Sequence, residues 1–376
     1  YESLGENRYR FTWNETAGEY YCVQRLTSEG DWETVEEFER GENREYITEA
    51  LHSGSRVVYR AAAADPDGTL ICVSEETEIR ADYLTAGCTI WPVRELPLHD
   101  PGTMEPMETV VQTGSAYRIL EESDGMFLVE SGGVQGYIDS RYCMINLPEY
   151  LGELCAYDIT NSYSSLYRMH DYVIPGITET VIFGYEQVFL SDGRYLVPYL
   201  YPCCEKLIAA AEAALEDGFR LKIYDAYRPR EATTQLYTTA ESILDDPLPG
   251  TEDPVTGEET LSVYRDLVTN ERYTLANFLA RNGSSHNLGI ALDLTLETLD
   301  GEELTMQTQM HDLSWYSAVD RNNEYANLLS SYMTEAGFHI LVSEWWHFQD
   351  NETRDALELD YLQDGVLALG QSAAEE

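Results

Sequence analysis

The sequence predicts an α+β domain that follows two small all-β modules. With 376 residues, the chain exceeds the roughly 100 to 200 residues of one ordinary domain, so two or three domains are expected. Up to about residue 146, short strands alternate with turns rich in Gly, Asp and Asn, which is typical of all-β modules. From about residue 147, helices are interleaved with strands, and this pattern favours an α+β domain.

The first module is expected over residues 1–84. Its predicted strands are 9–13, 20–26, 34–38, 45–47, 57–63 and 69–73. Strands at this spacing predict a β-sandwich. Residues 11–14, together with 59–61 and the turn at 65–68, resemble a fibronectin type III module. This resemblance implies a spacer or an adhesion element.

The second module is expected over residues 85–146, with strands at 110–111, 116–121, 126–130 and 135–138. Residues 117–125, 127–129 and 136–142 resemble a bacterial Src-homology-3-type β-barrel. In exported bacterial enzymes such modules often bind cell-wall peptides. A packing spacer is the alternative, with about even weight.

The third domain is expected over residues 147–368. Apolar residues at helical spacing predict a helix over 202–217 that ends at Gly218, followed by a strand over 219–224. A second helix is predicted over 325–335, ending before Gly337. Residues 245–259 are expected to form a loop, and 369–376 a frayed tail.

The formal charge is −45, from 68 acidic and 23 basic side chains. Nucleic acids and anionic membrane surfaces are bound through clustered Lys and Arg, so this charge excludes both as partners. No run approaches the roughly 18 to 20 apolar residues of a membrane span. The chain begins at Tyr1 and not Met, as it would after removal of a signal peptide, but this start does not by itself establish export.

Seven cysteines are too few for a disulfide scaffold, but some could close loops. The pairings left open are Cys22 with Cys72, Cys88 with Cys143, and Cys155 with Cys203 or Cys204. The adjacent Cys203 and Cys204 lack zinc-site spacing, which favours buried apolar residues.

The segment 284–293 contains His286 in a polar loop and Asp293 seven residues on, in a predicted strand. An imidazole nitrogen and a carboxylate oxygen are both zinc donors at about 2.0 to 2.2 Å. Taken alone, this spacing is also that of a surface histidine and a turn-capping aspartate. Gly289 allows the backbone to turn between the two residues.

The second segment is Glu344-Trp345-Trp346-His347-Phe348. His347 would be a third ligand, and three protein ligands leave a position for water, as catalytic zinc sites do. Zinc lowers the pKa of that water to about 7, and Glu344, outside the ligand set, would take its proton. The alternative is an aromatic core with Glu344 and His347 as a satisfied polar pair.

Two further segments carry charged side chains. Arg228, in the loop after the strand 219–224, could stabilise a developing oxyanion or tie the strand end to a carboxylate. Asp312 could receive a substrate ammonium group, and the neighbouring His311 is equally free to be a bystander.

The order Asp-Ala-Tyr-Arg-Pro, Ser-x-His-x-x-Gly-x-Ala-x-Asp and Glu-Trp-Trp-His resembles the D-Ala-D-Ala dipeptidases, over about 220 residues. The resemblance implies an α+β zinc peptidase domain of the hedgehog/D,D-peptidase-like fold. It implies a Zn²⁺ ion held by His286, Asp293 and His347, with Glu344 as general base and Arg228 stabilising the transition state. It also implies substrate-carboxylate binding by Ser284 and Ser285 and amino-group binding by Asp312.

Two segments depart from the family pattern: residues 307–311 lack its Gly and Phe, and 157–163 follow its early substrate segment only loosely. They leave the choice of dipeptide open. The expected function is hydrolysis of D-Ala-D-Ala or a related short D,D-dipeptide by a secreted or cell-wall-associated bacterial enzyme. The alternatives are a peptidoglycan D,D-carboxypeptidase or endopeptidase, anchored through the front modules, and a non-catalytic cell-surface binding protein. The presence of Glu344 argues against the last, because a pure binder needs no base.

Overall fold

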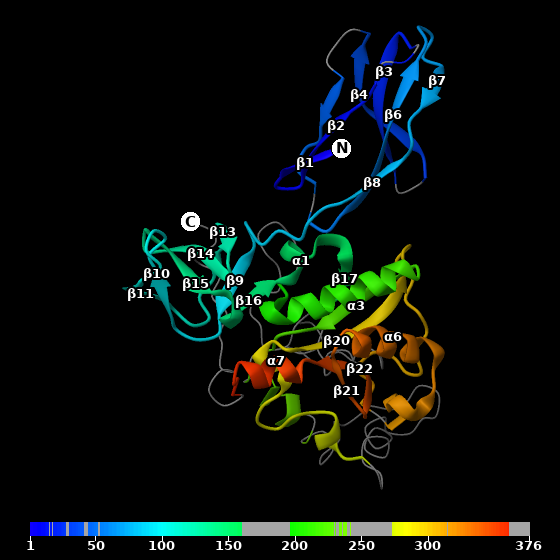
Figure 1. The fold of residues 1–376 in the computed structure, drawn as a ribbon. Coiled ribbons are helices and arrows are strands. Elements are labelled where there is room, and N and C mark those ends of the chain that lie inside the picture. The colour runs from blue at the N-terminus through cyan, green and yellow to red at the C-terminus, as the bar shows by residue number, and fades with distance from the viewer. Residues whose placement is uncertain are drawn as a thin grey trace, which may run out of the picture. The chain divides into compact units, whose positions relative to one another are not determined.

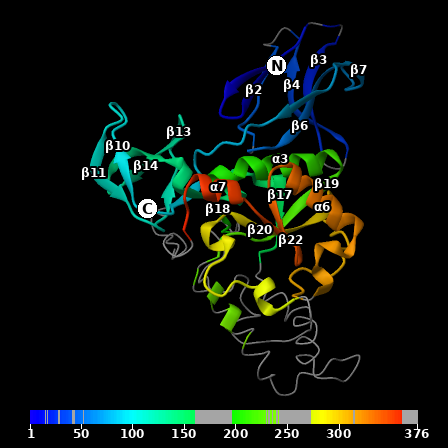
Figure 2. The same ribbon diagram turned by 60° about the horizontal axis from the view of Figure 1, so that its bottom comes forward.

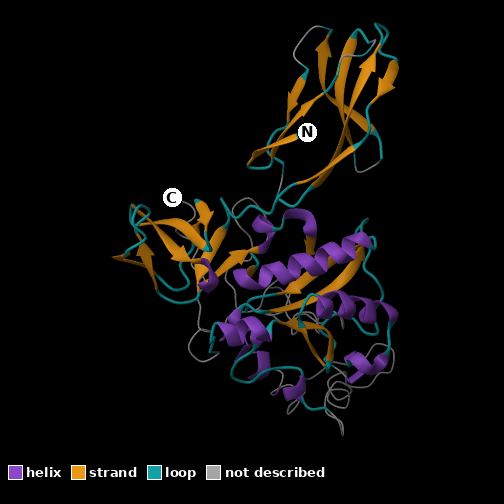
Figure 3. Ribbon diagram, viewed as in Figure 1, coloured by secondary structure: helices purple, strands orange, loops and turns teal. Residues whose placement is uncertain are grey.

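The chain forms two compact units, Tyr1–Leu84 with Tyr150–Glu153, and Thr85–Glu149 with Leu154–Glu376. In this computed structural model, residues 1–360 are described apart from 160–195, 242–272 and positions 15, 17, 28–29, 41–43, 52, 229, 231–232, 235, 239–240 and 314. Figure 1 traces the elements along the chain, and Figure 3 separates strands from helices. The expected loop 245–259, the tail 369–376 and most of 157–163 lie outside the described residues.

The first unit contains two antiparallel sheets. One has the order β1 (Glu2–Gly5), β2 (Arg8–Thr12), β5 (Glu45–Ile47), and the other β4 (Trp32–Glu39), β3 (Tyr20–Leu26), β6 (Arg56–Ala64), β7 (Leu70–Val73), with β8 (Thr77–Arg80) also paired to β6. Tyr9, Val23, Tyr59 and Ile79 form its buried core. All six predicted strands are present, whereas β1 and β8 were not predicted.

The pairings proposed for the cysteines are wrong, because all seven are free thiols. Cys22 lies in β3 and Cys72 in β7, with β6 between them. Two strand spacings amount to about 9 to 10 Å, beyond the roughly 7 Å that a disulfide spans between Cα atoms. Cys143 pairs with Pro92 across two antiparallel strands. Because Pro92 is four residues along the chain from Cys88, Cys143 and Cys88 are also too far apart to form a disulfide.

The second unit begins with two further sheets. The first has the order β11 (Pro106–Val111), β10 (Leu96–His99), β15 (Val134–Asp139), β14 (Met126–Ser131), β13 (Glu121–Ser123). The second has the order β12 (Tyr117–Arg118), β9 (Thr89–Pro92), β16 (Cys143–Asn146), β18 (Pro198–Leu200). The strand predicted over 116–121 is therefore divided between two sheets. β18 pairs with β16, so a strand from beyond residue 190 completes a sheet of the 85–146 segment.

The third sheet carries the candidate site. Its order is β17 (Cys155–Tyr157), β19 (Phe219–Asp225), β20 (Ala291–Thr298), β22 (Glu344–Gln349), β21 (His339–Leu341), and only the β17–β19 pair is parallel. The helices α3 (Cys204–Glu216) and α6 (Glu324–Glu335) pack against this sheet and against each other (Figure 2). Both helices therefore cover the same face.

The remaining elements of the second unit are short. They are α1 (Leu147–Tyr150), α7 (Asn351–Ala356) and the 3₁₀ turns η1 (Ser140–Tyr142), η2 (Gly152–Leu154), η3 (Tyr201–Cys203), η4 (Leu275–Asn277), η5 (Ser285–Leu288), η6 (Trp315–Ser317) and η7 (Val319–Arg321). None of the helices in the described part of the chain is long and apolar enough to cross a membrane.

Local sequence explains where the two long helices begin and end. α3 buries Leu207, Ala210, Ala211 and Ala214 and stops before Gly218, whose φ of +84° only glycine adopts readily. At the start of α6, the Asn323 side chain accepts hydrogen bonds from the backbone N–H groups of Tyr325 and Ala326. The predicted helix ends agree with the structure to within two residues.

Candidate metal centre and active site

The three central strands of the third sheet place two carboxylates and one imidazole side by side across the strands. Asp293 of β20 lies opposite His347 of β22 on one side and opposite Asp225 of β19 on the other. Directly paired residues of antiparallel strands point to the same face, so the register gathers residues from sequence positions more than a hundred apart. His286 comes from the adjoining turn η5.

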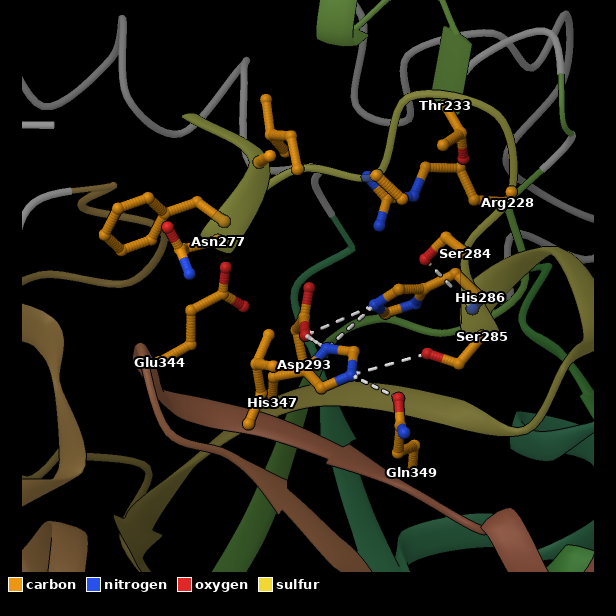
Figure 4. Close-up of a pocket in the computed structure, with 16 residues that line it drawn as sticks. Arg228, Thr233, Asn277, Ser284, Ser285, His286, Asp293, Glu344, His347 and Gln349 are labelled. Atoms are coloured by element: carbon orange, nitrogen blue, oxygen red, sulfur yellow. Dashed lines mark hydrogen bonds and ion pairs between the residues drawn. The ribbon is translucent and has the colours of Figure 1, made fainter. Parts of the chain in front are cut away.

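Three donor atoms form a compact triangle (Figure 4). His347 Nδ1 lies 3.0 Å from Asp293 Oδ1 and 3.2 Å from His286 Nε2, and the distance from His286 Nε2 to Asp293 Oδ1 is 3.4 Å. An ion with tetrahedral bonds of about 2.0 to 2.1 Å requires donors about 3.3 Å apart. The predicted residues His286, Asp293 and His347 therefore lie together with spacing that fits a zinc ion.

Each imidazole is oriented by a contact at its other nitrogen. His286 Nδ1 lies 2.6 Å from the carbonyl oxygen of Ala226, which leaves Nε2 for a metal. His347 Nε2 lies 3.2 Å from Gln349 Oε1 and 3.4 Å from Ser285 Oγ, and these contacts leave His347 Nδ1 available to bind a metal. Such outer partners fix the tautomer and the ring plane of metal-binding histidines.

The turn η5 holds His286 in place. Ser284 caps this turn by accepting a hydrogen bond from the His286 N–H, and Asn287 accepts one from the Ser284 N–H. The turn ends at Gly289, with a φ of +67°. A Cβ atom there would lie 2.8 Å from Met144 Sδ, so the close approach to β16 also requires glycine.

The charge state of the site is set by burial and by the histidines. Burial alone would raise the pKa of Asp293, but contacts with His286, His311 and His347 hold it well below its usual range. Asp293 is therefore ionised, as a metal ligand must be.

Glu344 lies outside the donor triangle. Its side chain is almost fully buried, and its Oε1 atom has no hydrogen-bond partner among the described residues. Burial raises the pKa of Glu344 to about 8, with His347 opposing this shift and Asp293 adding to it. A carboxyl group with a raised pKa beside a metal site is a candidate general base and acid.

Arg228 is held from several directions. Its Nε atom lies 3.2 Å from Asp225 Oδ2, its backbone N–H donates to the His286 carbonyl at 3.2 Å, and its own carbonyl accepts from Asn287 Nδ2 at 2.7 Å. Burial raises the pKa of Asp225, while Arg228 opposes that shift. The guanidinium group is thus a fixed positive charge at the edge of the site.

A cavity of about 240 Å³ opens at these residues. Its lining residues are Arg228, Thr233, Ala276, Asn277, Phe278, Leu279, Ala280, Gly283, Ser284, Ser285, His286, Asp293, Leu341, Glu344, His347 and Gln349. Seven of the eight predicted site residues are among them. Asp312 is the exception, since the described lining of the cavity does not include it.

Three side chains near the site were not predicted. Asn287 donates to Arg228 and to Thr233 Oγ1, Gln349 contacts His347, and His311 contacts Asp293. A sequence signal existed for Asn287, because Ser284 and Asn287 have capping-box spacing. The roles of Gln349 and His311 depend on strand pairing and loop path, which no local motif reports.

Comparisons with known proteins find relatives of the C-terminal part of the chain. Residues 194–349 match the family model of VanY, D-alanyl-D-alanine carboxypeptidase. A D-alanyl-D-alanine dipeptidase of Enterococcus faecium is 32% identical over 155 residues, covering 39% of this chain and 70% of the relative. The Streptomyces coelicolor enzyme of the same name is 32% identical over 152 residues (39% and 69%), and that of Escherichia coli over 141 residues (35% and 55%).

Two solved structures also overlap with the chain. They are a zinc(II) complex of the vancomycin-resistance D,D-pentapeptidase VanY (17% identity) and VanYB with D-alanine-D-alanine (15% identity). Each match covers 49% of this chain and 86% of the other, with a TM-score of 0.27.

The donor triangle, the buried Glu344 and the sequence matches together define the C-terminal part as a peptidase, an enzyme of the hydrolase class. Within that class, the chain belongs to the D-alanyl-D-alanine dipeptidase family.

Proposed function

We propose that this protein is a zinc-dependent D,D-peptidase of cell-wall peptide metabolism that hydrolyses D-Ala-D-Ala or a related short D,D-dipeptide. The observation that carries the proposal is the donor triangle with edges of 3.0 to 3.4 Å, with the buried Glu344 lining the same cavity. Two imidazoles and one carboxylate are a zinc-type donor set that leaves a position open for catalysis. The family of the chain supplies the substrate class.

Each site residue has a proposed role. His286, Asp293 and His347 would hold a zinc ion, which would supply polarisation of the peptide carbonyl and a lower pKa of the attacking water. Glu344 takes a proton from that water as the C–O bond forms, and delivers it to the leaving nitrogen as the C–N bond breaks. Arg228 stabilises the negative charge that develops on the carbonyl oxygen.

The remaining polar residues are assigned to the ends of the substrate. Ser284 and Ser285 line the cavity and are proposed to bind the substrate carboxylate. Asp312 is proposed to receive the free amino group. It directly follows His311, whose ring contacts Asp293, so its backbone is close to the site. A cavity of about 240 Å³ is below the ~300 to 1,000 Å³ of drug-sized sites, which favours a small substrate.

Substrate length tests the proposal. The zinc-loaded protein is incubated with D-Ala-D-Ala and, in parallel, with an N-acylated peptide that ends in D-Ala-D-Ala, and released D-Ala is measured. Cleavage of the free dipeptide alone supports a dipeptidase, whereas cleavage of the acylated peptide supports the alternative, a peptidoglycan carboxypeptidase. Cleavage of neither rejects both.

We further propose that residues 1–84 form a fibronectin type III-like sandwich, 85–146 a Src-homology-3-like barrel and 147–368 the peptidase domain, in a protein secreted to the bacterial cell wall. The two sheets of the first unit support the first boundary, and the short antiparallel strands that follow support an all-β second segment, one sheet of which is completed by β18. Co-sedimentation of the full chain with insoluble peptidoglycan, with excess D-Ala-D-Ala present to occupy the active site, tests whether the front modules bind the wall. A chain that stays in the supernatant would leave them as spacers.

A further inference from the structure

His311 is a fully buried histidine with no role in the ligand set or in proton transfer. Its backbone has a φ of +61°, in the left-handed region that few residues other than Gly adopt, although His is enriched there together with Asn and Asp. Such a conformation costs of the order of 1 kcal/mol or more and persists only where the surroundings determine it. The contacts of the imidazole ring are therefore expected to offset the cost of this backbone conformation.

The ring reaches the carboxylate ligand from the side away from the donor triangle. His311 Nε2 lies 3.2 Å from Asp293 Oδ2, whereas the other oxygen, Oδ1, faces His286 and His347. The two oxygens of Asp293 are thus divided between the metal site and His311.

Two aromatic rings fix the position of this imidazole. The ring of Tyr224 lies 6.3 Å from it at an interplanar angle of 88°, and the ring of Trp346 lies 5.7 Å from it at 87°. Both are edge-to-face contacts, the arrangement that aromatic pairs favour. Because Tyr224 belongs to β19 and Trp346 to β22, His311 is held by the two strands that flank Asp293.

The chemistry of the contact determines its direction. A carboxylate that ligates a metal is deprotonated and can only accept, so the 3.2 Å contact is a hydrogen bond when the proton is on His311 Nε2. A hydrogen bond to Oδ2 opposes rotation of the carboxylate and favours binding of an ion through Oδ1 alone. Partners of this kind outside the ligand set typically contribute about 10- to 100-fold in metal affinity or activity.

We propose that His311 is a positioning residue that holds Asp293 with Oδ1 directed to the metal. The inference rests on the proposed zinc site and assigns that site an additional residue.

A matched pair of variants tests the hydrogen bond. His311→Gln keeps an N–H donor at about the reach of Nε2, and His311→Met has the same length without a donor. The zinc dissociation constant of each metal-free protein is measured by competition with a chromogenic chelator. We expect His311→Met to weaken zinc binding about 10- to 100-fold and His311→Gln to stay within about threefold of the unchanged protein. His339→Gln, at an exposed position of β21, is the control and should bind zinc as the unchanged protein does.

Each outcome is decisive. Equal zinc binding by both His311 variants and the unchanged protein overturns the proposal, and so does an equal loss in both, which would assign the effect to ring packing. If the unchanged protein does not bind zinc, the metal site itself is rejected. This outcome differs from those that reject only the role of His311, in which the unchanged protein binds zinc. If His311→Met does not fold, ¹⁵N NMR of the zinc-loaded unchanged protein decides, since an unprotonated Nε2 on His311 contradicts the hydrogen bond.

Discussion

The imidazole of His347 lies directly opposite the carboxylate of Asp293 across β22 and β20, with Nδ1 3.0 Å from Oδ1. Two of the three donors are therefore placed by backbone pairing in the middle of a sheet, and the third by the capped turn η5. A site built on strands needs little rearrangement to accept an ion, because its ligands are held before the ion arrives.

Removal of the metal should abolish peptide hydrolysis and lower the melting temperature. An ion bound only by the folded state at a hundred times its dissociation constant contributes about 2.7 kcal/mol to stability. Thermal unfolding is followed before and after chelation and after zinc is restored. The control is the double variant His286→Ala with His347→Ala, whose melting temperature should not respond to zinc. A response equal to that of the unchanged protein would place the ion elsewhere.

Glu344→Gln should reduce kcat by about 10²- to 10⁴-fold, the usual contribution of a general base. Zinc binding should be retained, because Glu344 lies outside the donor triangle. Steady-state kinetics and zinc stoichiometry are measured on the same preparation. Glu352→Gln, an exposed glutamate in α7, is the control and should keep full activity. Activity above about a tenth of normal in the Glu344 variant would exclude it as the base.

Arg228→Met should lower kcat by about 10²- to 10³-fold with a smaller change in KM, because the guanidinium acts on charge that develops only in the transition state. Arg230→Met is the control, since Arg230 is close in sequence but does not line the described cavity. A change confined to KM would instead make Arg228 a residue that binds the ground state of the substrate.

Seven of the eight residues predicted from the sequence line the cavity. They could be predicted because they lie in short motifs whose order along the chain resembles the D-Ala-D-Ala dipeptidases, whereas each motif by itself left an alternative open. The long elements could be predicted from local sequence as well. In α3, α6 and most strands, apolar residues recur at the spacing that is typical of a helix or a strand.

Other features depended on contacts between distant segments. The thiols of Cys22 and Cys72 share a module, yet β6 separates them, and only the strand order reveals this. β18 pairs with β16 across about fifty residues of sequence, and His311, whose φ is positive, contacts Asp293 from a loop eighteen residues further along the chain. Strand order and loop path are properties of the whole chain, so neither could be read from a local pattern.

Asp350 should make stability depend on pH through its bond to Lys206. Its carboxylate is fully buried, lies 2.8 Å from Lys206 Nζ, and accepts from both the N–H and the hydroxyl of Thr353 at the start of α7. Burial would raise the pKa of Asp350, but Lys206 and Thr353 hold it below its usual value. The unfolded state therefore binds the proton more tightly, and the stabilisation is complete above a pH of about 4 and is lost as the pH falls towards the folded pKa.

Asp350→Asn should accordingly lower stability by about 1.5 to 3 kcal/mol near neutral pH, the range for hydrogen bonds to charged groups. The difference from the unchanged protein should narrow as the pH falls below about 4 towards the lowered pKa of folded Asp350, because the carboxylate then loses its charge. Melting temperatures measured between pH 3 and pH 7 test this. Glu352→Gln is the matched control, because Glu352 contacts the same lysine at 3.1 Å but is 72% exposed, and such exposed pairs contribute about 0 to 1 kcal/mol. A constant difference between Asp350→Asn and the unchanged protein across this range would show that packing, and not charge, is what Asp350 contributes.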